Sequence, residues 1–161
     1  MASQPENMPA DFEAAFQYLG GVSAPSVNDF KLMAYVETGG EAFYAGIANG
    51  TSNQKIKDLL NKNGREERAH AHRLKKVIEK LSGDTFTVPS PAENPYYVQP
   101  EGIVVDKDFL NFLIEAEVSG DNLYETWASS VSDEECAGWL RQNGKEEINH
   151  SERVKEALGY L

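Results

Sequence analysis

The sequence contains a single cysteine, Cys136, among 161 residues. Within one chain this excludes a disulfide framework and any zinc or iron–sulfur site built from several cysteines, and it suits a reducing cytosol. No apolar run approaches the roughly 18 residues of a membrane span. The first residues also lack the basic start and the apolar stretch of a signal peptide. We therefore predict a cytoplasmic protein.

Positive charge is scarce as well. The 15 Lys and Arg residues against 26 Asp and Glu residues give a formal net charge of −11. Nucleic acids and anionic membranes attract basic faces, so neither is an expected partner. The chain is long enough for one domain with a single core.

Residues 37–73 and 117–153 are two copies of one segment. Aligned without a gap, 12 of their 37 positions are identical. Ordinary composition predicts roughly two identities over such a length. Within each copy the apolar residues recur at helical spacing, in the alternating steps of four and three that are typical of a bundle seam. The chain is therefore expected to contain two copies of one helical hairpin.

These patterns predict an all-α fold, an antiparallel four-helix bundle made of two repeated hairpins with a long crossover. The bundle is expected over residues 26–161, with hairpins at 26–82 and 106–160 and a proline-containing crossover at 83–105. Ser52 and Ser132 are the predicted N-caps of the second helix in each hairpin. Residues 1–25 form an N-terminal extension with one short helix around Asp11–Leu19.

Four carboxylates and two imidazoles lie on the stripes that should face the core. An unpaired charge in a core is costly, so such residues are rare unless they are paired or bound to metal. Both copies contain a Glu-x-x-His motif, and neighbours three residues apart project from one helix face. The six predicted ligands are Glu37, Glu67, His70, Glu117, Glu147 and His150.

The six groups are expected to converge on one layer of the bundle. Glu37 lies about 12 residues before the turn near residues 49–52 and Glu67 about 15 residues after it, which places them roughly 18 and 22 Å from the same end. Because the second copy repeats the first, Glu117 and Glu147 should lie at the same heights along the bundle as Glu37 and Glu67. Four carboxylates balance two divalent cations, and oxygen and nitrogen ligands without thiolate suit iron or manganese, with zinc as a further candidate.

Two residue pairs are candidates for supporting the ligands. Tyr44 and Tyr124 lie two turns after Glu37 and Glu117, and they are either core aromatics or hydrogen-bond partners of ligand carboxylates. Asn63 and Asn143 lie four residues before the second ligand of each copy. Because a buried amide needs partners, a supporting role is favoured for both.

Glycine and charge also recur beside the predicted ligands. Gly40 and Gly120 either permit close helix packing or leave space beside the metals for a small oxidant. Glu66 and Glu146 are neighbours of the ligands in sequence but face about 100° away from them on a helix. We predict that these two are surface or interface charges. Arg73 and Arg153, three residues after the histidines, are expected either in surface salt bridges or paired with carboxylates near the site.

On these motifs, the sequence resembles the ferritin-like superfamily, and most closely the rubrerythrin-type proteins, over about residues 28–160. The resemblance rests on the spacing of Glu37 and Tyr44 and of Glu117 and Tyr124, together with GREERAH and GKEEINH. It implies a di-iron centre that reacts with dioxygen or hydrogen peroxide. Rubrerythrins usually add a rubredoxin-like domain with four cysteines, so an external electron donor is expected here.

The leading functional hypothesis is a di-iron or di-manganese oxidoreductase that reduces hydrogen peroxide or dioxygen, acting as a homodimer. One alternative is iron handling, in which a ferroxidase site oxidises Fe(II) for storage or delivery. Another is an oxygenase acting on an organic substrate, which would require an apolar tunnel. A fourth alternative is a structural metalloprotein without turnover.

Overall fold

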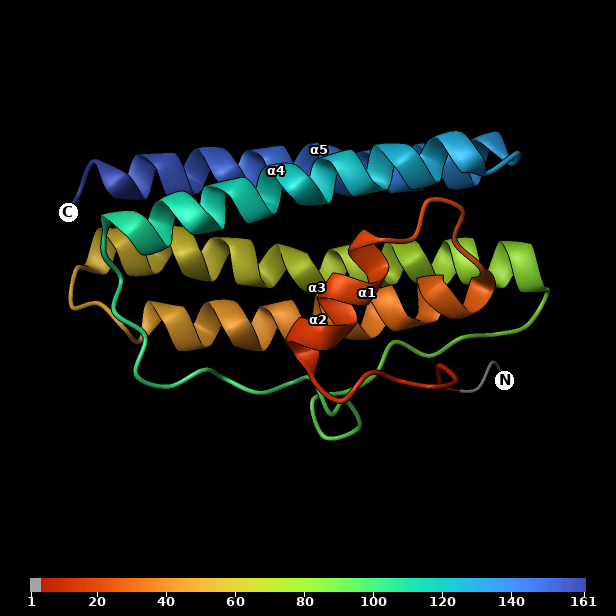
Figure 1. Ribbon diagram of the computed structural model, residues 1–161, viewed down its shortest axis with the longest axis horizontal. Helices are drawn as coiled ribbons and strands as arrows, with labels where there is room; N and C mark the ends of the chain where they lie inside the picture. Colours follow the sequence, from red (N-terminus) through yellow and green to blue (C-terminus); the bar gives the residue numbers. More distant parts are fainter. Residues whose placement is uncertain (1–3) are drawn as a thin grey trace.

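The computed structural model describes residues 4–161, and this part of the chain contains five α-helices and no strand. The helices are α1 (Phe12–Gly20), α2 (Val27–Ala48), α3 (Gln54–Ser82), α4 (Lys107–Ser130) and α5 (Glu134–Leu158). The predicted all-α bundle is confirmed. Figure 1 shows two long hairpins side by side, α2 with α3 and α4 with α5, and α3 packs on α5 between them. No helix described here combines the length and the apolar character needed to cross a membrane.

The second helix of each hairpin begins one residue later than predicted. Asn53 caps α3, where its side chain accepts hydrogen bonds from the backbone N–H groups of Lys55 and Ile56. Asp133 caps α5 by accepting from the N–H of Cys136. The predicted caps Ser52 and Ser132 are therefore wrong. Asn and Asp are at least as good N-caps as Ser. Asn53 and Asp133 occupy equivalent positions of the repeat, so both copies cap the helix at the same place with different residues.

The crossover from α3 to α4 runs along the outer face of α2 (Figure 1). It leaves α3 at Gly83, whose positive φ of 78° favours glycine. Asn94 then holds the crossover against α2, because its amide donates to the carbonyl oxygen of Tyr35 and to the hydroxyl of Thr38. The crossover thus covers α2 and leaves the inner side of that helix free to face the second hairpin.

The short helix α1 was predicted at about its observed position, and the structure shows what it packs against. Asp11 caps it by accepting from the N–H of Ala14. The ring of Phe12 stacks on Phe43 of α2, with ring centroids 5.8 Å apart. The indole of Trp127 in α4 donates to the carbonyl oxygen of Val22, just after α1. The N-terminal segment therefore contacts both hairpins.

The apolar core is divided into two clusters along the bundle. On α3, Leu74 belongs to one cluster and Leu60 to the other. On α5, Leu140 and Val154 are divided in the same way. The predicted ligands lie between these levels on both helices. The fold therefore holds one buried polar layer between two apolar ones, and their burial supplies the stability that the polar layer lacks.

Candidate metal centre

All six predicted ligands lie in this polar layer. Each of the four long helices contributes a carboxylate, and α3 and α5 each add an imidazole one turn later. The carboxylate residues are at most 7% exposed and both histidines are fully buried. Burial of this kind is costly for charged groups unless opposite charge or metal compensates it.

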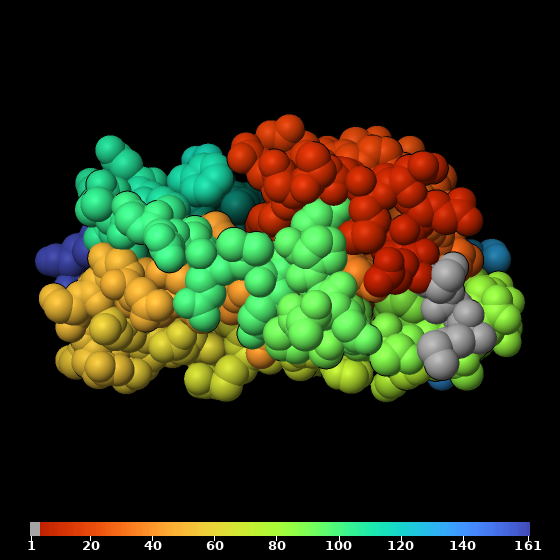
Figure 2. Space-filling model, turned by 90° about the horizontal axis from the view of Figure 1, so that it is seen from below, coloured from red at the N-terminus to blue at the C-terminus, as the bar shows by residue number. Residues whose placement is uncertain are grey.

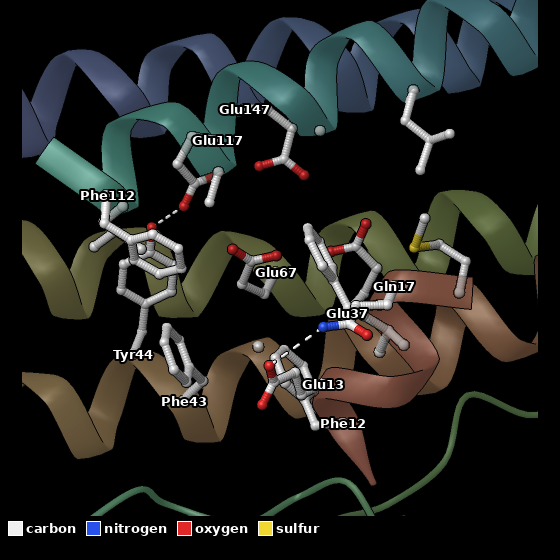
Figure 3. Close-up of a pocket in the computed structure, with 18 of the residues that line it drawn as sticks. Phe12, Glu13, Gln17, Glu37, Phe43, Tyr44, Glu67, Phe112, Glu117 and Glu147 are labelled. Carbon is white, nitrogen blue, oxygen red and sulfur yellow. Dashed lines mark hydrogen bonds between the residues drawn. The ribbon is translucent and has the colours of Figure 1, made fainter. Parts of the chain in front are cut away.

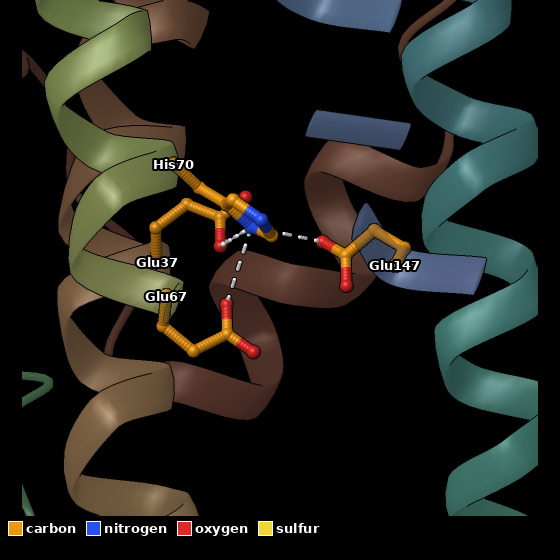
Figure 4. Close-up of side chains that lie close together, drawn as sticks. All are labelled: Glu37, Glu67, His70 and Glu147. Carbon is orange, nitrogen blue, oxygen red and sulfur yellow. Dashed lines mark ion pairs between the residues drawn. The ribbon is translucent and has the colours of Figure 1, made fainter. Parts of the chain in front are cut away.

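The six groups form two overlapping clusters that are compatible with a site for two metal ions. Within each cluster, one candidate ligand atom from every residue lies within 4.8 Å of the others. Figure 4 shows the first cluster, with the imidazole of His70 among three carboxylates. The clusters are Glu37, Glu67, His70 and Glu147, and Glu67, Glu117, Glu147 and His150. Glu67 and Glu147 belong to both.

The two shared carboxylates each turn one oxygen toward each imidazole. Glu147 places Oε1 3.4 Å from Nδ1 of His70 and Oε2 3.3 Å from Nδ1 of His150. Glu67 places Oε2 3.6 Å and Oε1 3.4 Å from the same two atoms. Ligand atoms about 2.1 Å from one ion are roughly 3–3.5 Å apart. The spacing suits a cation in each cluster, and both carboxylates would be available to both ions.

The imidazoles indicate which of their nitrogen atoms would bind metal. In residues 4–161, Nδ1 of His70 and Nδ1 of His150 are the buried side-chain polar atoms without a hydrogen-bond partner. A buried nitrogen in that state is costly, and a neutral imidazole nitrogen is a common metal ligand. Both atoms face the carboxylates of their clusters. The donor set therefore fits two metal ions.

Glu66 and Glu146 are partly exposed charges at the boundary between the hairpins, and the prediction of surface or interface charges missed their contacts with the two imidazoles. Oε2 of Glu146 lies 3.0 Å from Nε2 of His70, across the boundary between the hairpins, and Glu66 lies 3.1 Å from Nε2 of His150. A side chain that lies about 100° from the ligand face of α3 points toward α5, as Glu66 does. In the same way, Glu146 of α5 points toward α3. A carboxylate on Nε2 fixes the tautomer that leaves Nδ1 free. Their recurrence in both copies was the available sign of this role.

Two arginines complete these contacts. Arg73 donates to Glu146 at 2.7 Å, and Arg153 donates to Glu66 at the same distance. Both arginines are therefore paired with carboxylates near the site, the second of the two alternatives for them. The hydrogen bond with His70 lowers the pKa of Glu146 to about 2, and the hydrogen bond from Arg73 lowers it further against the effect of burial. The outer carboxylates therefore remain ionised and are neutralised locally.

The two tyrosines connect the hairpins through the remaining ligands. Tyr44 of α2 donates its hydroxyl to Glu117 of α4, and Tyr124 of α4 donates to Glu37 of α2. Burial raises the pKa of Tyr124 well above its ordinary value, with a further contribution from the charge of Glu37. The phenol therefore keeps its proton and can donate it in a hydrogen bond to the carboxylate.

Asn63 and Asn143 join the same network from α3 and α5. Each amide donates to the backbone carbonyl oxygen of the histidine on the other helix, at 3.2 Å, so Asn63 contacts His150 and Asn143 contacts His70. Each amide oxygen accepts from an arginine, Arg153 or Arg73, at 2.9 and 3.0 Å. The amides therefore hold α3 and α5 in register at the level of the ligands.

Gly40 and Gly120 make room for the shared carboxylates. A Cβ at Gly40 would lie 3.3 Å from Cδ of Glu67, and one at Gly120 would lie 3.4 Å from Cδ of Glu147. The distance at Gly40 is tight for such a contact, and the distance at Gly120 is at the lower limit of ordinary van der Waals contact. The two glycines also line a cavity beside the site. The observed geometry thus favours space at the ligands over close packing of helix on helix.

Without cations, protons compensate the buried negative charge. Burial raises the pKa of Glu37 and of Glu117 well above the usual value, so these two bind protons more readily than exposed carboxylates do. Burial alone would lower the pKa of His150, but the nearby carboxylates of Glu117, Glu147 and Glu67 raise it to about 12. Burial also opposes ionisation of Glu67, yet its pKa falls to about 2 because the two imidazoles beside it outweigh that effect and the charge of Glu147. Metal ions would replace these protons.

A cavity of about 510 Å³ lies between α2 and α4 and reaches the ligands. In Figure 3 the carboxylates of Glu37, Glu67, Glu117 and Glu147 point into this space, and Gln17 of α1 lies beside it. The cavity exists because each of these helices packs mainly on its own hairpin partner. The sequence did not predict this cavity, because an apolar pattern does not show which neighbouring helices separate.

Fold and site together define a helical bundle with a buried carboxylate and histidine cluster suited to two metal ions. Comparison with known families agrees, because residues 33–158 match the Rubrerythrin family. This match covers well over half of the chain, and the chain belongs to the rubrerythrin family, a ferritin-like family. No curated protein and no solved structure matches the chain.

Proposed function

We propose that the chain is a di-iron oxidoreductase that reduces hydrogen peroxide or dioxygen with electrons from an external donor. The observation that carries the proposal is the pair of unpartnered Nδ1 atoms of His70 and His150, each facing three carboxylates. Glu37 and Glu117 would each hold one ion, and Glu67 and Glu147 would bridge both. Two adjacent iron ions supply two electrons together, which is the number needed to convert peroxide and two protons into two water molecules.

The chain's own residues provide positioning and access for this reaction. Glu66 and Glu146 fix the imidazoles through Nε2, so both Nδ1 atoms stay aimed at the metals. Tyr44 and Tyr124 donate hydrogen bonds from their hydroxyl groups to the carboxylates of Glu117 and Glu37. The cavity beside Gly40 and Gly120 leaves one side of the site open to a small oxidant.

Stopped-flow absorbance of the iron-loaded protein tests the proposal. The protein loaded with Fe(II) without oxygen is mixed with hydrogen peroxide or with air-saturated buffer at equal oxidant concentration. We expect oxidation by peroxide to be at least tenfold faster, because peroxide takes up both electrons of one site in a single encounter. Glu147→Ala should abolish the fast phase, whereas Glu152→Ala, an exposed position on the same helix, should retain it. Oxidation by air as fast as by peroxide would contradict the peroxide preference and favour the ferroxidase alternative.

A further inference from the structure

The cavity beside the metal centre is much larger than a small oxidant requires. Its volume is about 510 Å³, whereas one water molecule occupies roughly 30 Å³ in the liquid, and peroxide or dioxygen is of comparable size. The volume falls within the roughly 300–1,000 Å³ of sites that bind small organic molecules. Access for an oxidant therefore leaves most of this space unexplained.

The walls of the cavity are apolar and come from three helices. Phe12 and Phe16 of α1 form one side, Met33 and Val36 of α2 form another, and Leu113 and Leu123 of α4 form the third. Such a lining favours an apolar ligand, because burying apolar surface is worth roughly 25 cal/mol per Å².

One end of the cavity opens to solvent. Phe16 and Phe112 are part of the lining and are 41% and 61% exposed. On the face shown in Figure 2, the surface is hollowed between the red atoms of the N-terminal segment and the teal atoms of α4. The opposite end reaches the ligand carboxylates. The cavity is therefore a short path from a partly exposed aromatic rim to the metal centre.

The polar residues of the lining define the charge of the occupant. Besides the four ligand carboxylates and the two tyrosines, they are Glu13 and Gln17 of α1, which hydrogen-bond to each other at 3.3 Å. The lining contains no Lys, Arg or His. An anionic head group would find no counter-charge among the side chains of the lining, and it would face the carboxylate of Glu13 at the rim. The lining therefore selects against free acids.

We propose that this cavity binds an uncharged, elongated apolar organic molecule, such as a medium-length aliphatic alcohol or ester, with one end against the metal-ligand layer. α1 forms one wall of this site, which gives the N-terminal extension a role in ligand selection. The proposal goes beyond the peroxide or dioxygen chemistry proposed above and does not depend on it.

Fluorescence of N-phenyl-1-naphthylamine, an uncharged apolar probe, tests the site directly. The full chain is titrated both metal-free and loaded with Zn²⁺, which is redox-inert. We expect saturable binding of one probe per chain, displacement by 1-decanol, and at least tenfold weaker displacement by decanoate. A probe signal that does not saturate, or equal displacement by decanoate, would overturn the proposed ligand class. Because no iron chemistry is measured, this outcome is independent of the peroxide test.

Three variants locate the bound probe. Ala116→Phe fills the cavity from α4 and should weaken binding at least tenfold, whereas Ala69→Phe, at an exposed position on α3 outside the lining, should leave it unchanged. Gln17→Leu replaces the amide in the α1 wall and should strengthen binding at least twofold, which misfolding would not produce. Probe binding that is unaffected by Ala116→Phe and Gln17→Leu would overturn the assignment. Binding that disappears as the chain self-associates would instead assign this face to a second copy.

Discussion

At the residue scale, a hydrogen bond between each histidine and a carboxylate outside the ligand set, Glu146 or Glu66, determines which ring nitrogen faces the ligands. Glu146 is hydrogen-bonded to Nε2 of His70 and accepts a hydrogen bond from Arg73. In the second copy, Glu66 makes the same two contacts, with His150 and with Arg153. None of these contacts follows from helical periodicity within one segment, because each joins α3 to α5. The paired Glu-Glu in both copies, followed by Arg at a constant distance, is the sequence pattern that corresponds to it.

Glu146→Gln should weaken metal binding at one of the two positions. The amide keeps the shape but loses the charge that favours the Nε2–H tautomer of His70. We expect a loss of roughly 10–100-fold in affinity, the effect typical for groups that orient a metal ligand. Competition titration with a chromophoric chelator measures it. The matched control is Glu152→Gln, which is exposed on the same helix, and equal affinities for the two variants would show that Glu146 has no orienting role.

Metal binding should release protons. The pKa of His150, about 12, means that this imidazole holds a proton at neutral pH in the metal-free protein, and the pKa values of Glu37, Glu117 and His70 are raised as well. Cations need ionised carboxylates and a free Nδ1, so they displace these protons and their affinity should fall as the pH is lowered. Calorimetric titrations in buffers with different ionisation enthalpies count the protons. A binding enthalpy that is independent of the buffer would contradict this account.

At the scale of the helices, glycine marks where two of them approach closely. A Cβ at Gly64 of α3 would lie 2.9 Å from Cβ of Tyr44, the residue that connects α2 to Glu117. At the exposed Gly138 of α5, a Cβ would have no neighbour within 4 Å. Gly64 is therefore needed for close packing of the helices, whereas Gly138 only adds backbone entropy to the unfolded chain.

Alanine substitutions at these two glycines should have opposite effects on stability. Gly64→Ala should lower the free energy of unfolding by about 1–2 kcal/mol, because crowding against Tyr44 outweighs the gain in helix propensity. Gly138→Ala should raise it by about 0.5–1 kcal/mol, since it improves propensity without a contact. Urea denaturation of both metal-free variants gives the comparison. A stabilised Gly64→Ala would mean that α2 and α3 are more loosely packed than the structure indicates.

The hairpins were predictable because the repeat and the seam are local patterns along the chain. Glu67 and His70 share a helix face by spacing alone, and the turn places Glu37 at their level. The packing of α1 and the cavity between α2 and α4 were not predictable. Whether Phe12 packs on Phe43 or elsewhere depends on the path of the N-terminal segment, and an apolar stripe such as Met33 and Val36 does not show whether a helix or a void faces it.

At the scale of the whole molecule, a layer of buried carboxylates lies between two apolar clusters, so the stability of the fold should depend on whether metal ions are bound in that layer. Metal binds the folded state only and should therefore raise the melting temperature. Glu67→Ala removes a carboxylate shared by both clusters and should abolish that increment while preserving the helical circular dichroism signal. A wild-type increment in this variant would show that Glu67 is not a ligand.

We propose that one chain holds two metal ions in this layer, between ligands supplied by both hairpins. Elemental analysis of the protein after anaerobic loading with Fe(II) and desalting tests it most directly, with the chain concentration determined by amino-acid analysis. The account predicts two iron ions per chain. A reproducible value of one or zero would contradict it.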